Sequence, residues 1–336
     1  MKKIFYYVIP LLVFFSACQN EKKDLIGPEY QVAPVGFNLT SNFSSNLSNV
    51  NFATGDKQFF NAQFSERATW TITLKGQTSQ AIKTITGLSD RIDENNSLWL
   101  GTHDELMFFR SGEDVEATLS ILGFKDSYKL NFKITNARVY PGAKEMGSGF
   151  EGFEYNQLDW YYSPYPNKTV GGKVSSPVIE GNYAFKLSGV DDNNDYFIGS
   201  VRRTIPKNFL TSATKDFYVN VFVYGTGSNT SKLKVSLKHD SDSKFPYGVP
   251  QGYVDTEDDA YEYEVPLNFK GWQLVSIKYS SFTRTLDRDF GGSGPNTKDP
   301  SKLVFVDFAL LTKTIGEKAE VVLDYPTITF DKAFMQ

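Results

Sequence analysis

Apolar and polar residues alternate with a period of two along much of the chain, and this limits what it can fold into. In the stretch ATWTITLKG, Ala68, Trp70 and Ile72 alternate with threonines. Residues 115–121 and 128–135 repeat the pattern. Successive side chains of a strand point to opposite faces, so each stretch predicts a strand with one buried and one wet face. No long stretch has a helical period, and we expect an all-β protein.

A length of 336 residues is typical of two domains. The proline- and glycine-containing segment 138–149 separates two strand-rich parts and predicts the boundary between them. Residues 35–139 have the size and pattern of an immunoglobulin-like sandwich. Residues 150–331 contain more strands with longer loops, which predicts a jelly-roll β-sandwich.

The N-terminal residues 1–17 have the features of a bacterial signal peptide, a basic start followed by a short apolar run. Ser16 and Ala17 precede Cys18, which is the only cysteine of the chain. This order resembles a lipobox, which implies cleavage before Cys18 and attachment of lipid to it. Residues 18–34 would then be a tether, and we expect a lipid anchor in the outer membrane, at the cell surface. The alternative is a plain signal peptide followed by an unpaired cysteine.

Charge and composition exclude several functions. The formal net charge of −4 argues against a nucleic-acid partner, which would need a basic stripe. Two histidines leave little room for histidine-based catalysis or zinc binding. No serine-hydrolase, zinc-protease or phosphate-loop motif is present, and no pair of carboxylates stands out among the 39 acidic residues. We therefore expect no catalytic residues and no enzymatic activity.

Four segments of the second part follow one another in a recognisable order. They are Phe153–Glu154 with Trp160, GNYAFKL at 181–187, KGWQLVSIKYSSF at 270–282 and VVLDYPTI at 321–328. This order resembles the galactose-binding-like jelly rolls found among carbohydrate-binding modules. The resemblance implies a sugar-binding jelly roll. It also implies a structural calcium near Glu154 and Asp324, where two carboxylates would repel each other without a cation.

A proline-bounded aromatic segment is the first candidate for the ligand site. It contains Trp160, Tyr161, Tyr162 and Tyr165, and its prolines are unfavourable in a central strand. Surface loops often carry binding groups, and aromatic rings bury the flat C–H faces of sugars. We expect these four rings to form a platform. The alternative is that Trp160 and one or two of the tyrosines close over the core.

The stretch 216–225 is the second candidate. One of its faces is an ordinary core set, whereas the other carries Tyr218, Asn220, Phe222 and Tyr224. Three rings are unusual on a solvent-facing strand, and an exposed apolar patch marks some contact. The face is therefore either a shallow sugar-binding groove or a surface that a loop or the other domain covers.

Charged residues in 189–203 give a third, weaker signal. The acids and amides of 191–195 are either calcium ligands or a solvated turn. Arg202 or Arg203 could clamp a pair of sugar hydroxyls or a carboxylate. The alternative for both arginines is an ion pair with a neighbouring acid.

The chain as a whole resembles the surface glycan-binding lipoproteins of outer-membrane polysaccharide uptake systems. The resemblance implies a polysaccharide or oligosaccharide ligand and a partner complex that contains an outer-membrane glycan transporter. Two other functions remain open on the sequence. One is a structural or adhesive lipoprotein that docks a protein, and the other is a carbohydrate-active enzyme.

Overall fold

The computed structural model describes residues 36–139, 143–146, 150, 160–164, 169–191, 196–211, 213–214, 216–245, 258–285 and 294–330. In these residues the chain forms three sheets of six strands each. The helical elements among them are α1 (Glu94–Ser97) and the single 3₁₀ turns η1 (Phe52–Thr54), η2 (Tyr279–Ser281) and η3 (Pro300–Lys302). The predicted all-β class is confirmed. None of the helices in the described part is long and apolar enough to cross a membrane.

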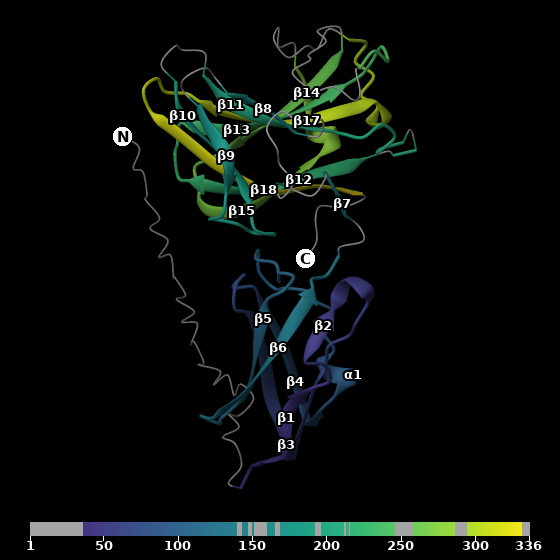
Figure 1. Cartoon of the computed structure of the whole chain (residues 1–336), viewed down its shortest axis with the longest axis vertical. Coiled ribbons are helices and arrows are strands. Elements are labelled where there is room, and N and C mark those ends of the chain that lie inside the picture. The colour runs from purple at the N-terminus through teal and green to yellow at the C-terminus, as the bar shows by residue number, and fades with distance from the viewer. Residues whose placement is uncertain are drawn as a thin grey trace, which may run out of the picture.

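The first sheet forms the N-terminal unit, residues 36–139 (Figure 1). Its strands are β1 (Leu39–Ser45), β2 (Asn49–Asn51), β3 (Phe60–Gly76), β4 (Ile82–Ile92), β5 (Asp114–Ile121) and β6 (Ser127–Asn136). They run in the order β1-β3-β5-β6-β2, with β4 paired to β3. The alternation seen in the sequence decides which residues are buried, because Trp70, Ile72 and Leu74 of β3 all face the core.

The second and third sheets form the C-terminal sandwich, in which every strand pair is antiparallel. One sheet has the order β15-β12-β18-β10-β9, with β7 on β18, and the other has the order β16-β14-β13-β17-β11-β8. The strands are β7 (Ala143–Glu145), β8 (Trp160–Pro164), β9 (Thr169–Val174), β10 (Ala184–Val190), β11 (Phe197–Thr204), β12 (Phe217–Thr226), β13 (Ser231–His239), β14 (Asp259–Pro266), β15 (Lys270–Lys278), β16 (Thr283–Arg284), β17 (Leu303–Thr312) and β18 (Lys318–Phe330).

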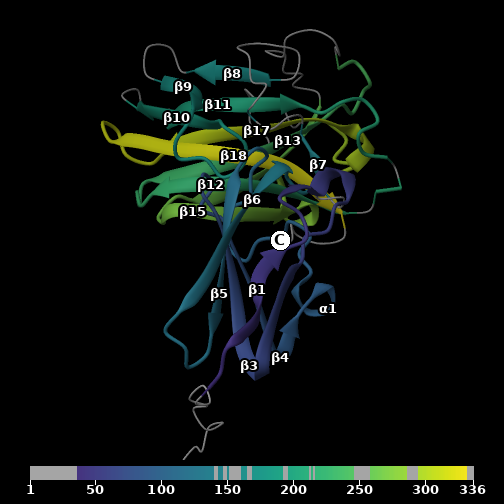
Figure 2. The same ribbon diagram turned by 60° about the horizontal axis from the view of Figure 1, so that its bottom comes forward.

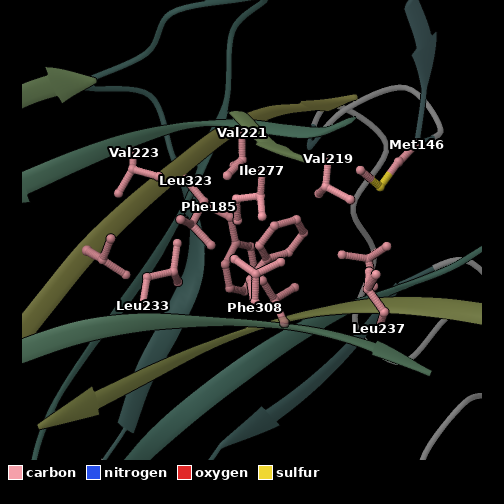
Figure 3. Packing of buried hydrophobic residues seen from close by; sticks show 14 of the residues in the cluster. Met146, Phe185, Val219, Val221, Val223, Leu233, Leu237, Ile277, Phe308 and Leu323 are labelled. Atoms are coloured by element: carbon pink, nitrogen blue, oxygen red, sulfur yellow. The ribbon is translucent and has the colours of Figure 1, made fainter. Parts of the chain in front are cut away.

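The core of the sandwich lies between these two sheets. Figure 3 shows Val221 and Leu323 of one sheet facing Leu233 and Phe308 of the other, and all four are completely buried. Burying one such side chain contributes about 1.5–3 kcal/mol to stability. In Figure 2 β12 and β15 lie next to the N-terminal unit, whereas β8 lies on the far side of the sandwich. The outer faces of the two sheets are therefore different surfaces, and this decides where a ligand can bind.

We predict that the sandwich loses stability as the pH falls below 6.5. The His239 ring is buried between Tyr261 and Tyr279, and desolvation lowers its pKa to about 4. The unfolded chain takes up a proton near pH 6.5, so acid favours unfolding between pH 6.5 and 4. The free energy of unfolding should fall by about 3 kcal/mol over this range from His239 alone.

Urea unfolding at a series of pH values between 7.5 and 4 measures this effect. A His239→Gln variant should have a flatter profile than the wild type, because glutamine does not titrate. An equally steep profile in the variant would show that other groups cause the acid sensitivity.

Candidate functional site

The predicted ligand residues are divided between the two outer faces of the C-terminal sandwich. On β12, Val219, Val221 and Val223 face the core, so the alternate residues of this strand lie on its outer face. Arg202 lies on β11 in the other sheet, with its neighbour Val201 in the core. The core separates the two sets, and they cannot contribute to one groove.

The outer face of β12 is covered by the N-terminal unit. Phe222 is 1% exposed and belongs to an apolar cluster with Ile179, Tyr325 and Phe108. The rings of Phe108 and Phe222 meet edge to face, with centroids 5.6 Å apart. The expectation that Phe222 offers a ring to a sugar is therefore wrong, because Phe108 from the N-terminal unit already occupies that surface.

The other predicted groups on β12 are also engaged within the protein. Asn220 is completely buried, its Nδ2 donates to Thr329 Oγ1 at 3.0 Å, and its Oδ1 accepts from Ser276 Oγ at 2.7 Å. These bonds leave Asn220 no role at a surface, which corrects that prediction. Tyr224 is half-buried against Trp272 at 5.4 Å. Tyr218 is half-buried on the same outer face.

The aromatic segment that we expected as a loop is β8, an edge strand. Tyr162 is 2% exposed and packs in the core against Phe185, so its predicted ligand role is wrong. A Cβ on Gly171 would lie 2.5 Å from the Tyr162 ring, which explains the glycine there. The register places Trp160 beside Arg203 and Tyr161 beside Arg202. The predicted residue Tyr165 lies outside the described residues.

Arg202 forms a buried ion pair on the outer face of β11. Its Nε lies 3.3 Å from Asp307 Oδ1, and Ser200 Oγ donates to the same oxygen at 3.0 Å. The guanidinium carbon stands 4.2 Å from the centre of the Phe305 ring. Burial raises the pKa of Asp307, and the charge of Arg202 acts against that rise. Of the two roles predicted for Arg202, the structure shows the ion pair with a neighbouring acid. The pair is buried and not at the surface.

The pair belongs to a row of directly opposed polar residues that crosses all six strands of the sheet. The row, from β8 to β16, is Tyr161, Arg202, Asp307, Ser236, Glu262 and Thr283. Five inter-strand steps of about 4.8 Å give a length of about 24 Å. We call these residues the polar row. Only Tyr161 and Arg202 of this row were predicted from the sequence as ligand residues. The other members come together through strand pairing, which local patterns do not reveal.

One end of the polar row is open to solvent. Arg202, Asp307 and Ser236 are buried, Glu262 is half-buried and Thr283 is exposed. Ser236 Oγ has no hydrogen-bond partner in the part of the chain that the structure describes. Beside the open end, Lys234 Nζ lies 3.7 Å from Glu262 Oε2. The open end thus offers one cation, one carboxylate and one hydroxyl, from Lys234, Glu262 and Thr283.

The predicted calcium pair is not seen as a pair, because Glu154 lies outside the described residues. Asp324 is buried, and its Oδ2 accepts from the backbone N–H groups of Ile179 at 2.6 Å and Glu180 at 3.1 Å. Asp324 therefore holds the 175–183 loop against β18. Within 189–203, Asp191 is buried and its Oδ2 accepts from Tyr196 N at 3.1 Å.

A different acidic group could hold a cation. Ligand oxygens of Asp240, Asp242 and Asp258 all lie within 4.8 Å of one another, and such oxygens suit calcium. Lys244 Nζ already pairs with Asp242 at 2.5 Å, which neutralises part of the charge. Asp258 is 1% exposed, so it is not part of a solvated surface loop. The group joins two distant segments, so its spacing in the sequence gave no signal.

No known family model matches the chain. Among solved structures it is similar to the family 11 carbohydrate-binding module of a cellulosomal cellulase of Clostridium thermocellum, with 13% identity and a TM-score of 0.39 over 57% of this chain and 96% of that one. It is also similar to a C-terminal family 22 carbohydrate-binding module of a Clostridium thermocellum xylanase, with 12% identity and a TM-score of 0.33 over 59% and 96%. These values are too low to assign a function.

We predict strong coupling between Arg202 and Asp307. Arg202→Met leaves a buried carboxylate without its cation and should cost about 3–5 kcal/mol of unfolding free energy. Asp307→Leu should cost a similar amount. The double variant should lose much less than the sum of the two, because an apolar pair leaves no uncompensated charge. Urea unfolding of the four proteins measures the coupling, and additive losses would contradict it.

Proposed function

We propose that the protein binds a polysaccharide or oligosaccharide along the polar row of the C-terminal sandwich. The observation that carries this proposal is the accessible end of the row, where Lys234, Glu262 and Thr283 offer a cation, a carboxylate and a hydroxyl. Sugar chains present hydroxyl groups at regular intervals, and cross-strand neighbours repeat at about 4.8 Å. Charged groups make stronger hydrogen bonds to hydroxyls than neutral groups do. The activity is binding, with no catalytic step.

The buried ion pair supports a binding role for this face. Arg202 and Asp307 occupy central strands, where apolar residues would be as stabilising or more so. Stability alone therefore does not account for the pair. The pair is buried, so it supports binding by fixing the sheet beside the accessible Lys234 and Glu262, and the contact with the ligand falls to those residues.

The open end of the row gives the ligand its point of entry. Lys234 and Glu262 are half-buried and Thr283 is exposed, so a sugar chain reaches these groups without any rearrangement. At the opposite edge, the backbone register places Tyr161 beside Arg202. This arrangement keeps the sheet that carries Tyr161 and Arg202 from the sequence-based site and replaces the β12 face.

The cellular setting of the proposal rests on the N-terminal sequence. Residues 1–18 support a signal peptide followed by a lipidated Cys18, and residues 18–34 support a tether. We place the protein in the outer membrane at the cell surface, where it would capture glycan for a transporter complex. The N-terminal unit would act as a spacer, and a structural calcium would bind the C-terminal sandwich.

We expect retention by at least one polysaccharide in affinity electrophoresis of the chain begun just after Cys18. Glu262→Gln should weaken this retention about tenfold, because a charged hydrogen bond to the sugar is lost. Glu320→Gln is the matched control, since Glu320 pairs with Lys186 at 2.9 Å on the outer face of the other sheet. Retention that is weakened equally by both variants, or no retention of the folded wild type, would contradict the proposal.

We expect the full chain to fractionate with membranes and to incorporate labelled palmitate in a bacterial host. Cys18→Ala should abolish the labelling, because Cys18 is the only thiol in the chain. Mass spectrometry of the mature N-terminus provides the direct check. An unmodified cysteine after cleavage would indicate a plain signal peptide.

A further inference from the structure

A polar pocket lies where the N-terminal unit meets the C-terminal sandwich. Its volume is about 180 Å³, and its lining comes from both units. The side chains that line it are Thr78, Arg110, Ser111 and Glu113 of the N-terminal unit and Glu180 and Asn182 of the sandwich. The ligand residues predicted from the sequence and the polar row contribute none of these side chains.

Arg110 bridges the two units at this pocket. Its Nη2 donates to the backbone oxygen of Val178 at 3.3 Å, and its backbone N donates to Glu113 Oε1 at 2.5 Å. Its Nε is buried and has no hydrogen-bond partner among the described residues. A buried N–H without an acceptor costs about 1–3 kcal/mol.

Glu113 forms a fixed wall of the pocket. Its Oε2 accepts from the backbone N–H groups of Thr78 at 3.2 Å and Ser79 at 3.0 Å. Its Oε1 accepts from Ser79 Oγ at 3.0 Å as well as from Arg110 N. Both oxygens are engaged, so this carboxylate positions Arg110 and leaves the contact with a ligand to other groups.

The chemistry of the lining selects a neutral polyhydroxylated ligand. It combines one guanidinium with the carboxylates of Glu113 and Glu180, a balance that disfavours an anion. Hydroxyls of Thr78 and Ser111 and the amide of Asn182 both donate and accept. The volume corresponds to about six water molecules in the liquid, which is the size of one sugar ring.

We propose that this pocket binds a single sugar unit, held between Arg110 of the N-terminal unit and Asn182 of the sandwich. This inference rests on the proposed function for one point only, that the ligand is a carbohydrate. The polar row lies on the other sheet, so the two sites are separate. A sugar held by Arg110 and Asn182 touches both units and stabilises their junction by mass action. The apolar contact between Phe108 and Phe222 stabilises the same junction.

Calorimetric titration of the chain begun just after Cys18 with glucose, galactose, mannose, xylose and N-acetylglucosamine tests the pocket. We expect one of these sugars to bind, and both Arg110→Met and Asn182→Ala to weaken it at least tenfold. Asn182 is exposed, so we expect Asn182→Ala to keep the fold. This variant therefore tests the pocket even if Arg110→Met loosens the junction. Glu320→Gln, at the ion pair with Lys186 outside both proposed sites, is the control and should leave monosaccharide affinity unchanged.

Two results would overturn the proposal that this pocket binds a sugar. One is monosaccharide binding that survives both Arg110→Met and Asn182→Ala. The other is no binding of any of the five sugars by a protein that polysaccharide still retains in electrophoresis, which leaves the proposed function intact. Absence of both monosaccharide and polysaccharide binding would overturn the pocket and the proposed function together.

Discussion

The contact between Phe108 and the outer face of β12 determines which surface of the sandwich remains for a ligand. Phe108 packs against Phe222 and Tyr325 at ring distances of 5.6 and 5.4 Å, and all three side chains are buried. Burial of these three rings stabilises the junction and removes this apolar part of the sheet face from solvent. An aromatic face that could have docked a foreign protein thus serves an intramolecular contact. The opposite sheet is left with the polar row.

The polar row and the junction pocket share one physical feature. In each, an acid of the same unit accepts a hydrogen bond from an arginine: Asp307 from Arg202 Nε, and Glu113 from the backbone N–H of Arg110. Orienting these groups costs desolvation energy during folding rather than during binding. Such sites suit weak but selective recognition of hydrated ligands, because little reorganisation opposes each contact.

Local patterns predicted the strands well, and long-range packing limited the prediction of the site. The alternation in 216–225 correctly predicted one core face and one outer face for β12. Phe108, which covers Phe222 on the outer face, comes from a loop far away in the sequence. Tyr162 was misassigned because prolines suggested a loop, whereas edge strands tolerate proline. Asp307, Ser236 and Glu262 could not be grouped with Arg202, since their alignment depends on pairing between four strands.

Hydrogen–deuterium exchange with an oligosaccharide of the retained glycan tests the central claim most directly. A sugar chain on the polar row should slow exchange in β11, β13 and β14, because it restricts the strands that carry Arg202, Ser236 and Glu262. Exchange in β12 and β15 should stay unchanged. Slowed exchange confined to β12 and β15 would contradict the account, because it would place the ligand on the face that Phe108 covers.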